Sequence, residues 1–157
     1  MDNFRKIDID QYDEEAISPE ELVESYPKAA EQATAEARAK STEVRGLIGR
    51  SDTAGALALI LSDYPYGPTV EEAKQITLHS LLEIVNSTKS SDISAAVKAI
   101  SIDQRDALMK FLYKGLQLGG EGADGVNCAV LLGWHERLTE VAGTGCIVRV
   151  MSDRRTL

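Results

Sequence analysis

The chain has 157 residues, of which 43% are hydrophobic and 5% aromatic, enough for one domain with a single hydrophobic core. Its formal charge of −8 lies in residues 1–36, which hold eleven acidic and three basic residues, whereas residues 37–157 hold fourteen of each sign. This acidic balance does not favour a nucleic-acid partner, and no apolar run approaches the ~18 residues that a membrane span requires.

The N-terminal segment combines many acidic residues with a few large apolar ones. Its composition buries too little apolar surface to offset the entropy of ordering, so we expect it to be largely disordered on its own. A solubilising tail would explain the acids but not Phe4, Ile7, Ile9 and Tyr12. The alternation of apolar and acidic residues over 7–10 suggests an extended piece with one side on a partner. We therefore interpret this segment as a partner-binding arm, and no signal-peptide core follows its first residues.

Two helices are expected directly after the arm. Residues 28–46 are rich in Ala, Glu, Lys and Arg, which are strong helix formers. Ser51 and Asp52 are good N-caps for a helix over residues 53–61, which stops before a Tyr-Pro pair.

A longer helix is predicted from Thr69 to about Asn86. Thr69 and Glu72 have the spacing of a capping box. The apolar residues in this stretch follow the i, i+3, i+4, i+7 spacing of a buried stripe: Leu78, Leu81, Leu82 and Val85.

The next part of the chain repeats an earlier part. Residues 91–100 match residues 51–60 at four positions in ten, and each match precedes a longer helix, here over 103–118. This spacing is typical of helix-pair repeats, although capped Ala-rich helices also resemble one another by chance. Under either interpretation we expect helical hairpins stacked side by side.

The C-terminal part contains a break and two more helices. Residues 119–125 are rich in glycine, and residues 126–141 form a helix with one buried stripe, which includes Trp134 and His135. Thr144 then caps a last short helix that has Ile147, Val150 and Met151 on a shared face. A strand is the alternative there, but a lone strand in an all-helical chain has no edge to pair with.

No pattern in the chain predicts a catalytic, cofactor or metal site. Residues 120–125 fit G-x-G-x-x-G, but they follow a predicted helix and carry two acids that would repel phosphate, so we interpret them as a loop. The Cys and His residues lack the paired spacing of zinc ligands, and His79 sits in an apolar helix as a structural residue: Cys128, Cys146, His79 and His135. Two cysteines also form no disulfide framework, which favours reduced thiols in a cytosolic protein.

Three blocks of sequence resemble a known family. They are F-R-K-I-D-I-D-Q-Y-D-E-E at residues 4–15, D-A-L-M-K-F-L-Y-K-G-L at 106–116 and W-H-E-R-L-T-E-V-A-G-T-G-C-I-V-R-V-M-S-D-R-R-T-L at 134–157. Together they cover 47 residues and closely resemble subunit 5, the 16 kDa subunit, of the actin-related protein 2/3 complex, which nucleates branched actin filaments. The resemblance implies a non-catalytic structural subunit of the cytoplasmic actin cytoskeleton.

The resemblance also implies a fold and a set of partners. It implies an all-α core, a compact α/α superhelix over residues 28–157, behind a flexible acidic arm and linker over 1–27. The helical domain would rest on subunit 4 and help to hold the WD-repeat subunit 1, and the arm would reach actin-related protein 2. ATP would be bound by the actin-related subunits, so no cofactor is expected here. The contact residues would be Phe4, Arg5, Ile7, Ile9, Tyr12 and Asp13 in the arm, and Trp134, Arg137, Ile147 and Arg149 in the C-terminal block.

The alternative is a free-standing helical-repeat adaptor that captures peptides in a concave groove. Such an adaptor would remain monomeric, whereas a subunit would occur in one stoichiometric assembly. In neither case does the sequence predict nucleic-acid or membrane binding.

Overall fold

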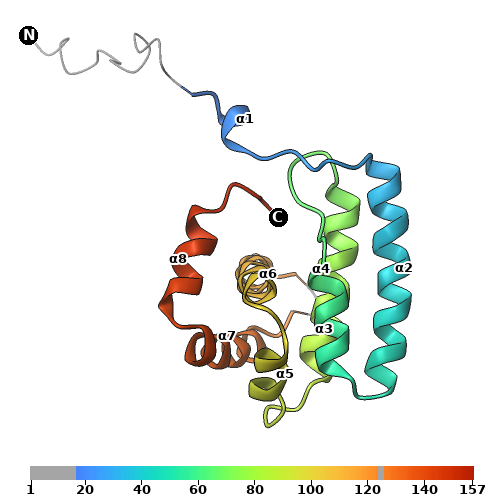
Figure 1. Cartoon of the computed structure of the whole chain (residues 1–157), viewed down its shortest axis with the longest axis vertical. Coiled ribbons are helices and arrows are strands. Elements are labelled where there is room, and N and C mark those ends of the chain that lie inside the picture. Colours follow the sequence, from blue (N-terminus) through green and yellow to red (C-terminus); the bar gives the residue numbers. More distant parts are fainter. Residues whose placement is uncertain (1–16, 124–125) are drawn as a thin grey trace, which may run out of the picture.

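The computed structural model describes residues 17–123 and 126–157, and within these ranges every regular element is an α-helix. The all-α prediction is therefore confirmed, while most of the predicted arm lies outside the described residues. Along the chain (Figure 1) the helices are α1 (Pro19–Leu22), α2 (Ala30–Gly49), α3 (Thr53–Leu61), α4 (Glu71–Ser87), α5 (Ile93–Ala99), α6 (Ile102–Gly120), α7 (Cys128–Ala142) and α8 (Thr144–Ser152).

Helix α6 occupies the centre of the domain. Figure 1 shows it nearly end-on, with α2, α3 and α4 on one side and α8 on the other, and it packs against α3, α4, α7 and α8. A capping box starts it: the Gln104 amide donates to Ser101 Oγ at 3.3 Å, and the Ser101 amide donates to Gln104 Oε1 at 3.0 Å. Because α6 has neighbours on several sides, six consecutive residues are buried, five apolar ones and a lysine: Ala107, Leu108, Met109, Lys110, Phe111 and Leu112.

Helices α2, α3 and α4 form one layer of the domain. Helix α2 packs on α4 and α3 through small residues, Ala33 and Ala37, and through Val44, which is fully buried. Small side chains let the helices approach closely. On the outer side, the Arg45 guanidinium forms a fork with the Glu83 carboxylate, with both N–O distances 3.1 Å.

Helix α7 is held by its tryptophan. Trp134 has no exposed surface, and its indole Nε1 donates to the carbonyl oxygen of Val85 at 3.3 Å, at the end of α4. The N-terminus of α7 is capped by Asn127 Oδ1, which accepts from the amides of Ala129 and Val130. Trp134 thus satisfies its only polar atom while filling the core between α4 and α7.

Two predicted caps are wrong. Helix α4 begins at Glu71, and no side chain caps it, so the box of Thr69 and Glu72 does not form; Glu72 instead reaches Arg38 of α2 at 2.6 Å. Helix α8 takes its N-cap at Gly143, with φ +74°, rather than at Thr144. In both cases the helix boundary was predicted within two residues, and only the capping group differs.

The predicted helix repeat does not produce two equivalent hairpins. Helix α3 packs against α4, which follows it, but α5 packs mainly on α7 and α3 rather than on the following helix α6. The likeness of residues 51–60 to 91–100 therefore reflects the shared composition of short buried helices.

Substitution of Trp134 by alanine tests the core. Removing a fully buried indole leaves a cavity and lowers the free energy of unfolding by about 3–5 kcal/mol. The matched control is Leu132→Ala in the same helix, where the side chain is 55% exposed and the expected change is within about 0.5 kcal/mol. Urea denaturation of both variants measures the difference; equal losses would contradict the placement of Trp134.

Candidate partner-binding surfaces

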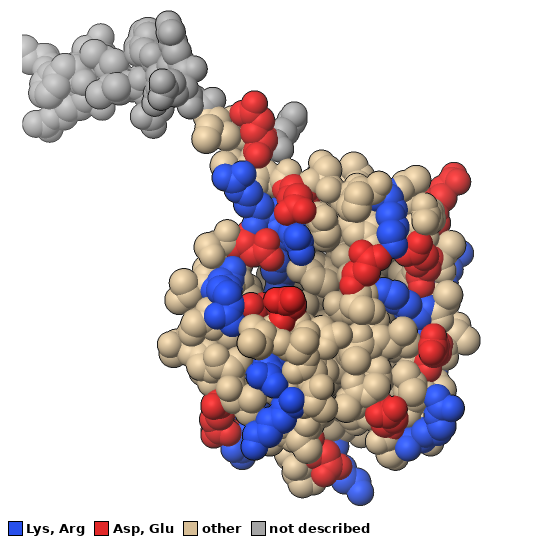
Figure 2. Space-filling view, viewed as in Figure 1, with Lys and Arg blue, Asp and Glu red and all other residues tan. Residues whose placement is uncertain are grey.

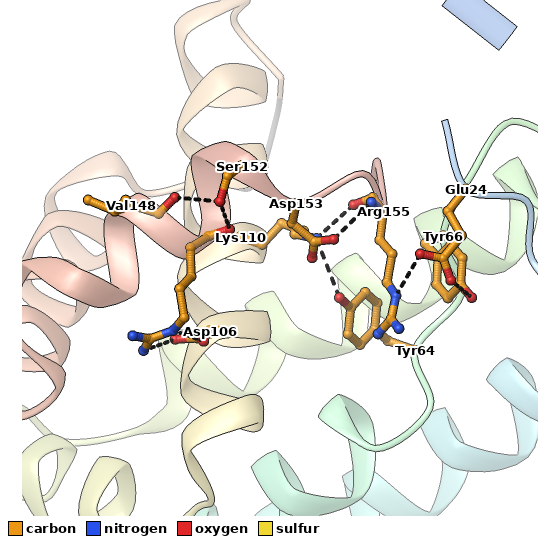
Figure 3. A network of polar contacts seen from close by, with 10 residues as sticks. Glu24, Tyr64, Tyr66, Asp106, Lys110, Val148, Ser152, Asp153 and Arg155 are labelled. Carbon is orange, nitrogen blue, oxygen red and sulfur yellow. Dashed lines mark hydrogen bonds and ion pairs between the residues drawn. The ribbon is translucent and has the colours of Figure 1, made fainter. Parts of the chain in front are cut away.

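The residues after α8, here called the C-terminal tail (residues 153–157), lie against the central helix. The amino group of Lys110, on α6, forms an ion pair with the Asp153 carboxylate and donates to the carbonyl oxygen of Arg155 at 2.7 Å (Figure 3). Its third neighbour is the hydroxyl of Tyr64 at 3.5 Å. Burial of Asp153 would raise its pKa, but the hydrogen bonds from Lys110 and from the Arg155 amide outweigh burial and lower it.

The C-terminal tail also contacts the segment that precedes α2, here called the arm root (residues 23–28). Arg155 Nε donates to Glu24 Oε2 at 3.3 Å, and the guanidinium lies over the Tyr66 ring, 5.2 Å from its centroid (Figure 3). The Tyr66 hydroxyl donates to the other oxygen of the same carboxylate at 3.0 Å. Opposite ends of the described chain thus meet on one side of the domain.

An open groove of about 660 Å³ borders the C-terminal tail. One wall comes from the end of α3 and the segment after it, including Asp63 and Tyr64, and the other from α6 and α8. Inside it Arg149 binds Asp106 in a fork, with N–O distances of 2.5 and 2.8 Å. Figure 2 shows acidic and basic side chains intermixed on this face, so the groove has no single sign of charge that would favour one charged ligand.

Helix α8 has an inner and an outer face. Cys146 is fully buried, and Ile147 and Val150 pack against the core from half-buried positions. On the outer face Val148 and Met151 are 65% and 69% exposed and lie one turn apart. The prediction that Met151 shares a face with Ile147 and Val150 is wrong, because the helix turns the Met151 side chain to solvent. This outer face is the candidate docking surface of the helix.

The predicted contact residues of the C-terminal block fall in two adjoining helices. Arg137 is half exposed on α7 and pairs with Glu140 at 3.0 Å, and Arg149 is half exposed on α8. Ile147 is half-buried, and Trp134 is wholly inside, so we assign Trp134 to the core. The predicted contacts in the arm all lie outside the described residues: Phe4, Arg5, Ile7, Ile9, Tyr12 and Asp13.

Sequence reasoning missed the pairing of the two chain ends. Glu24 and Arg155 are single charges among many, and neither belongs to a periodic pattern. A sequence signal was available for a different feature, the outer face of α8. On a helical wheel Val148 and Met151 lie on the side away from Cys146, as helix geometry requires.

The described residues contain neither a group of three potential metal-ligating side chains nor a helix long and apolar enough to cross a bilayer. His79, predicted to be structural within an apolar helix, is instead 72% exposed and lies 3.4 Å from Glu83. His135 contacts the Tyr113 hydroxyl at 3.1 Å, with the two rings edge to face. Neither histidine belongs to a set that orients a nucleophile.

The chain is similar to one family over nearly its whole length. The sequence model of the family described as ARP2/3 complex 16 kDa subunit (p16-Arc) matches residues 3–157. Actin-related protein 2/3 complex subunit 5-C of Xenopus laevis is 34% identical over 154 residues, which cover 98% of this chain and 94% of the relative. Subunit 5 of Saccharomyces cerevisiae is 34% identical over 157 residues, covering 99% and 98%. The subunit 5-like protein of Homo sapiens is 33% identical over 154 residues, covering 98% and 94%.

The two cysteines should differ in reactivity. Burial, followed by a hydrogen bond with Asp106, raises the pKa of the Cys146 thiol to about 12, so almost none of it is thiolate at pH 8. Cys128 is half-buried at the start of α7. In the native chain we expect iodoacetamide to label Cys128 and to spare Cys146, as followed by mass spectrometry, and to label both in urea. Native labelling of Cys146 at the rate of Cys128 would show that α8 opens.

Proposed function

The chain belongs to the family of the 16 kDa subunit of the ARP2/3 complex, and from this premise we propose that it is a structural subunit that links other subunits of that complex. In this proposal its helical domain docks on subunit 4 and the WD-repeat subunit 1, and its N-terminal arm straps actin-related protein 2. It would thereby support nucleation and branching of actin filaments without catalysing a reaction, in the cytoplasmic actin cytoskeleton.

The observation that carries this proposal is the outer face of α8. A monomeric domain gains nothing by exposing Val148 and Met151 one turn apart on a helix whose other apolar residues pack against the core, whereas a docked domain would bury them. The half-exposed charges of Arg137 and Arg149 lie on the same two adjoining helices and fit the polar rim of such an interface.

The arm acts in this proposal as a tethered ligand. Ordering an extended segment costs backbone entropy that a few apolar side chains hardly offset, so the free arm would bind weakly. Once the helical domain is docked, the arm is held close to its target, and its effective concentration supplies the missing affinity. Docking and strapping are therefore separable steps.

Substitutions in α8 separate docking from folding. Met151→Asp should leave the free energy of unfolding near that of the parent, because the side chain is 69% exposed, but it should reduce incorporation into the complex. Ile147→Asp places a charge at a half-buried core position and should lower the free energy of unfolding by about 2–4 kcal/mol.

The measurement combines urea denaturation with co-elution of the other subunits on size-exclusion chromatography. Ile102→Asp is the matched control, since Ile102 is 63% exposed but lies at the start of α6. If Met151→Asp assembles as well as Ile102→Asp and the parent, the outer face of α8 is not the docking surface. If the parent itself elutes alone from native extract, the subunit proposal is wrong and the alternative of a free-standing adaptor takes its place.

Deletion of residues 1–15 should leave the domain intact and weaken the strap. We expect an unchanged melting temperature, retained docking, faster loss of actin-related protein 2 on dilution and fewer branches. Phe4→Ala with Tyr12→Ala should produce part of this effect, since each side chain contributes at most about 1.5–3 kcal/mol when buried. Gln11→Ala is the control within the arm. If the armless complex forms branches and retains its subunits as well as the parent does, the arm is only a solvated tail and not a strap.

A further inference from the structure

The arm root is bound to the C-terminal tail through a single residue that uses both its backbone and its side chain. The Glu24 amide donates to the carbonyl oxygen of Arg154 at 3.2 Å. Its carboxylate accepts from Arg155 Nε at 3.3 Å and from the Tyr66 hydroxyl at 3.0 Å (Figure 3). Three contacts at one position fix both the location and the direction of the chain there.

A glycine lies between the two chain ends and allows their close approach. The Gly67 amide donates to the carbonyl oxygen of Thr156 at 2.7 Å. Its φ of +81° is one that residues with a side chain rarely adopt, and a Cβ at this position would stand 2.8 Å from the Glu24 carbonyl oxygen. The C-terminal tail, the loop at Gly67 and the arm root are therefore packed against one another backbone to backbone.

The C-terminal tail is itself held at both of its ends. Lys110 binds Asp153 and the Arg155 carbonyl oxygen, as described above. The last residue, Leu157, packs against the core and lines a small cavity of about 200 Å³ with Leu78 and Phe111. A segment fixed at both ends can restrain another segment that crosses it.

The rest of the arm root is attached by a different residue, Asp63. Its carboxylate accepts from the Lys28 amino group at 2.5 Å and from the Tyr26 hydroxyl at 3.4 Å. Lys28 also reaches Glu36 of α2 at 2.6 Å, and Tyr26 is 93% buried against the Tyr66 ring. In the described chain, the contact of Glu24 with the tail comes first after the short helix α1, and the contacts of Tyr26 and Lys28 follow.

We propose that the C-terminal tail is a latch that fixes the point at which the N-terminal arm leaves the domain, with Glu24 and Arg155 as its positioning residues. The inference concerns the described arm root, and its consequence for assembly rests on the proposed function of the arm. With the latch closed, the spacer between the predicted arm contacts, which end at Asp13, and the anchor at Glu24 is residues 14–23. Because residues 19–22 of this spacer form α1, it reaches less than the about 36 Å of ten fully extended residues.

An open latch would lengthen the spacer. With Glu24 released and Tyr26 still bound to Asp63, the spacer would be residues 14–25, or twelve residues instead of ten. Effective concentration falls roughly as the −3/2 power of tether length, so it would drop about 1.3-fold. The latch therefore acts mainly on where the arm can reach and only modestly on how tightly it is held.

Hydrogen exchange on the full-length chain tests the latch without any partner. Removing residues 154–157 should speed exchange of the Glu24 amide about tenfold, because its acceptor at Arg154 and the charge at Arg155 are lost. Arg155→Glu should speed it about threefold, and Glu24→Arg combined with Arg155→Glu should restore most of the protection. Arg137→Glu is the matched control, since it breaks the exposed pair with Glu140 on α7.

The outcomes separate the latch from the function of the arm. Unchanged exchange of the Glu24 amide in the truncated chain and in Arg155→Glu overturns the latch, as does equal acceleration by Arg137→Glu. If the truncated chain does not fold, the test of the latch rests on Arg155→Glu and on the double variant Glu24→Arg with Arg155→Glu. Faster exchange confirms the latch whatever the retention of actin-related protein 2 in the rebuilt complex, because releasing Glu24 changes the effective concentration of the arm only modestly; the strap is tested separately by the armless complex.

Discussion

A buried charged side chain on the central helix fixes the course of the C-terminal tail. Lys110 lies on the same helix as Phe111 and Leu112 and is only 9% exposed. An ammonium group in such a position is costly unless a counter-charge and hydrogen-bond acceptors surround it. The acceptors within reach are the Asp153 carboxylate and the Arg155 carbonyl oxygen. The C-terminal tail must therefore cross the domain here, and the contacts of Leu157, Gly67 and Glu24 follow from its course.

The local chemistry of the sequence was sufficient for the helices but not for their neighbours. Helix α3 was predicted residue for residue, because Asp52 caps it and Ser62 begins an extended segment. The packing of α5 on α7 was not predictable, since a short Ala-rich helix has no pattern that selects its partner. His79 shows the same limit: it was predicted to be structural because its helix is apolar, but such a helix has an outer side too, and His79 lies on it.

The sequence predicted which helices carry the candidate surfaces, but not which of their side chains are exposed. The C-terminal block was predicted to be a contact region, yet its largest residue, Trp134, is in the core, because an indole with a carbonyl partner is stabilised by burial. Met151 was predicted to share a face of α8 with Ile147 and Val150 and lies on the outer face instead. Adjacent apolar residues on a nine-residue helix leave its rotation undetermined until the neighbouring helices are known.

These features fit a subunit whose work is mechanical. In the proposed function the arm is a strap, and a tethered strap binds a defined target best if the domain that carries it is rigid where the strap begins. The two attachments of the arm root meet this need with different chemistry. Asp63, in the segment after α3, binds Tyr26 and Lys28, whereas the C-terminal tail, which follows α8, binds Glu24. Because the tail is fixed by Lys110, any force that the arm transmits reaches the central helix, and through it α4, α7 and the outer face of α8. In the proposed complex the strap and the docking surface would thus be joined through the central helix α6, rather than through a flexible surface loop.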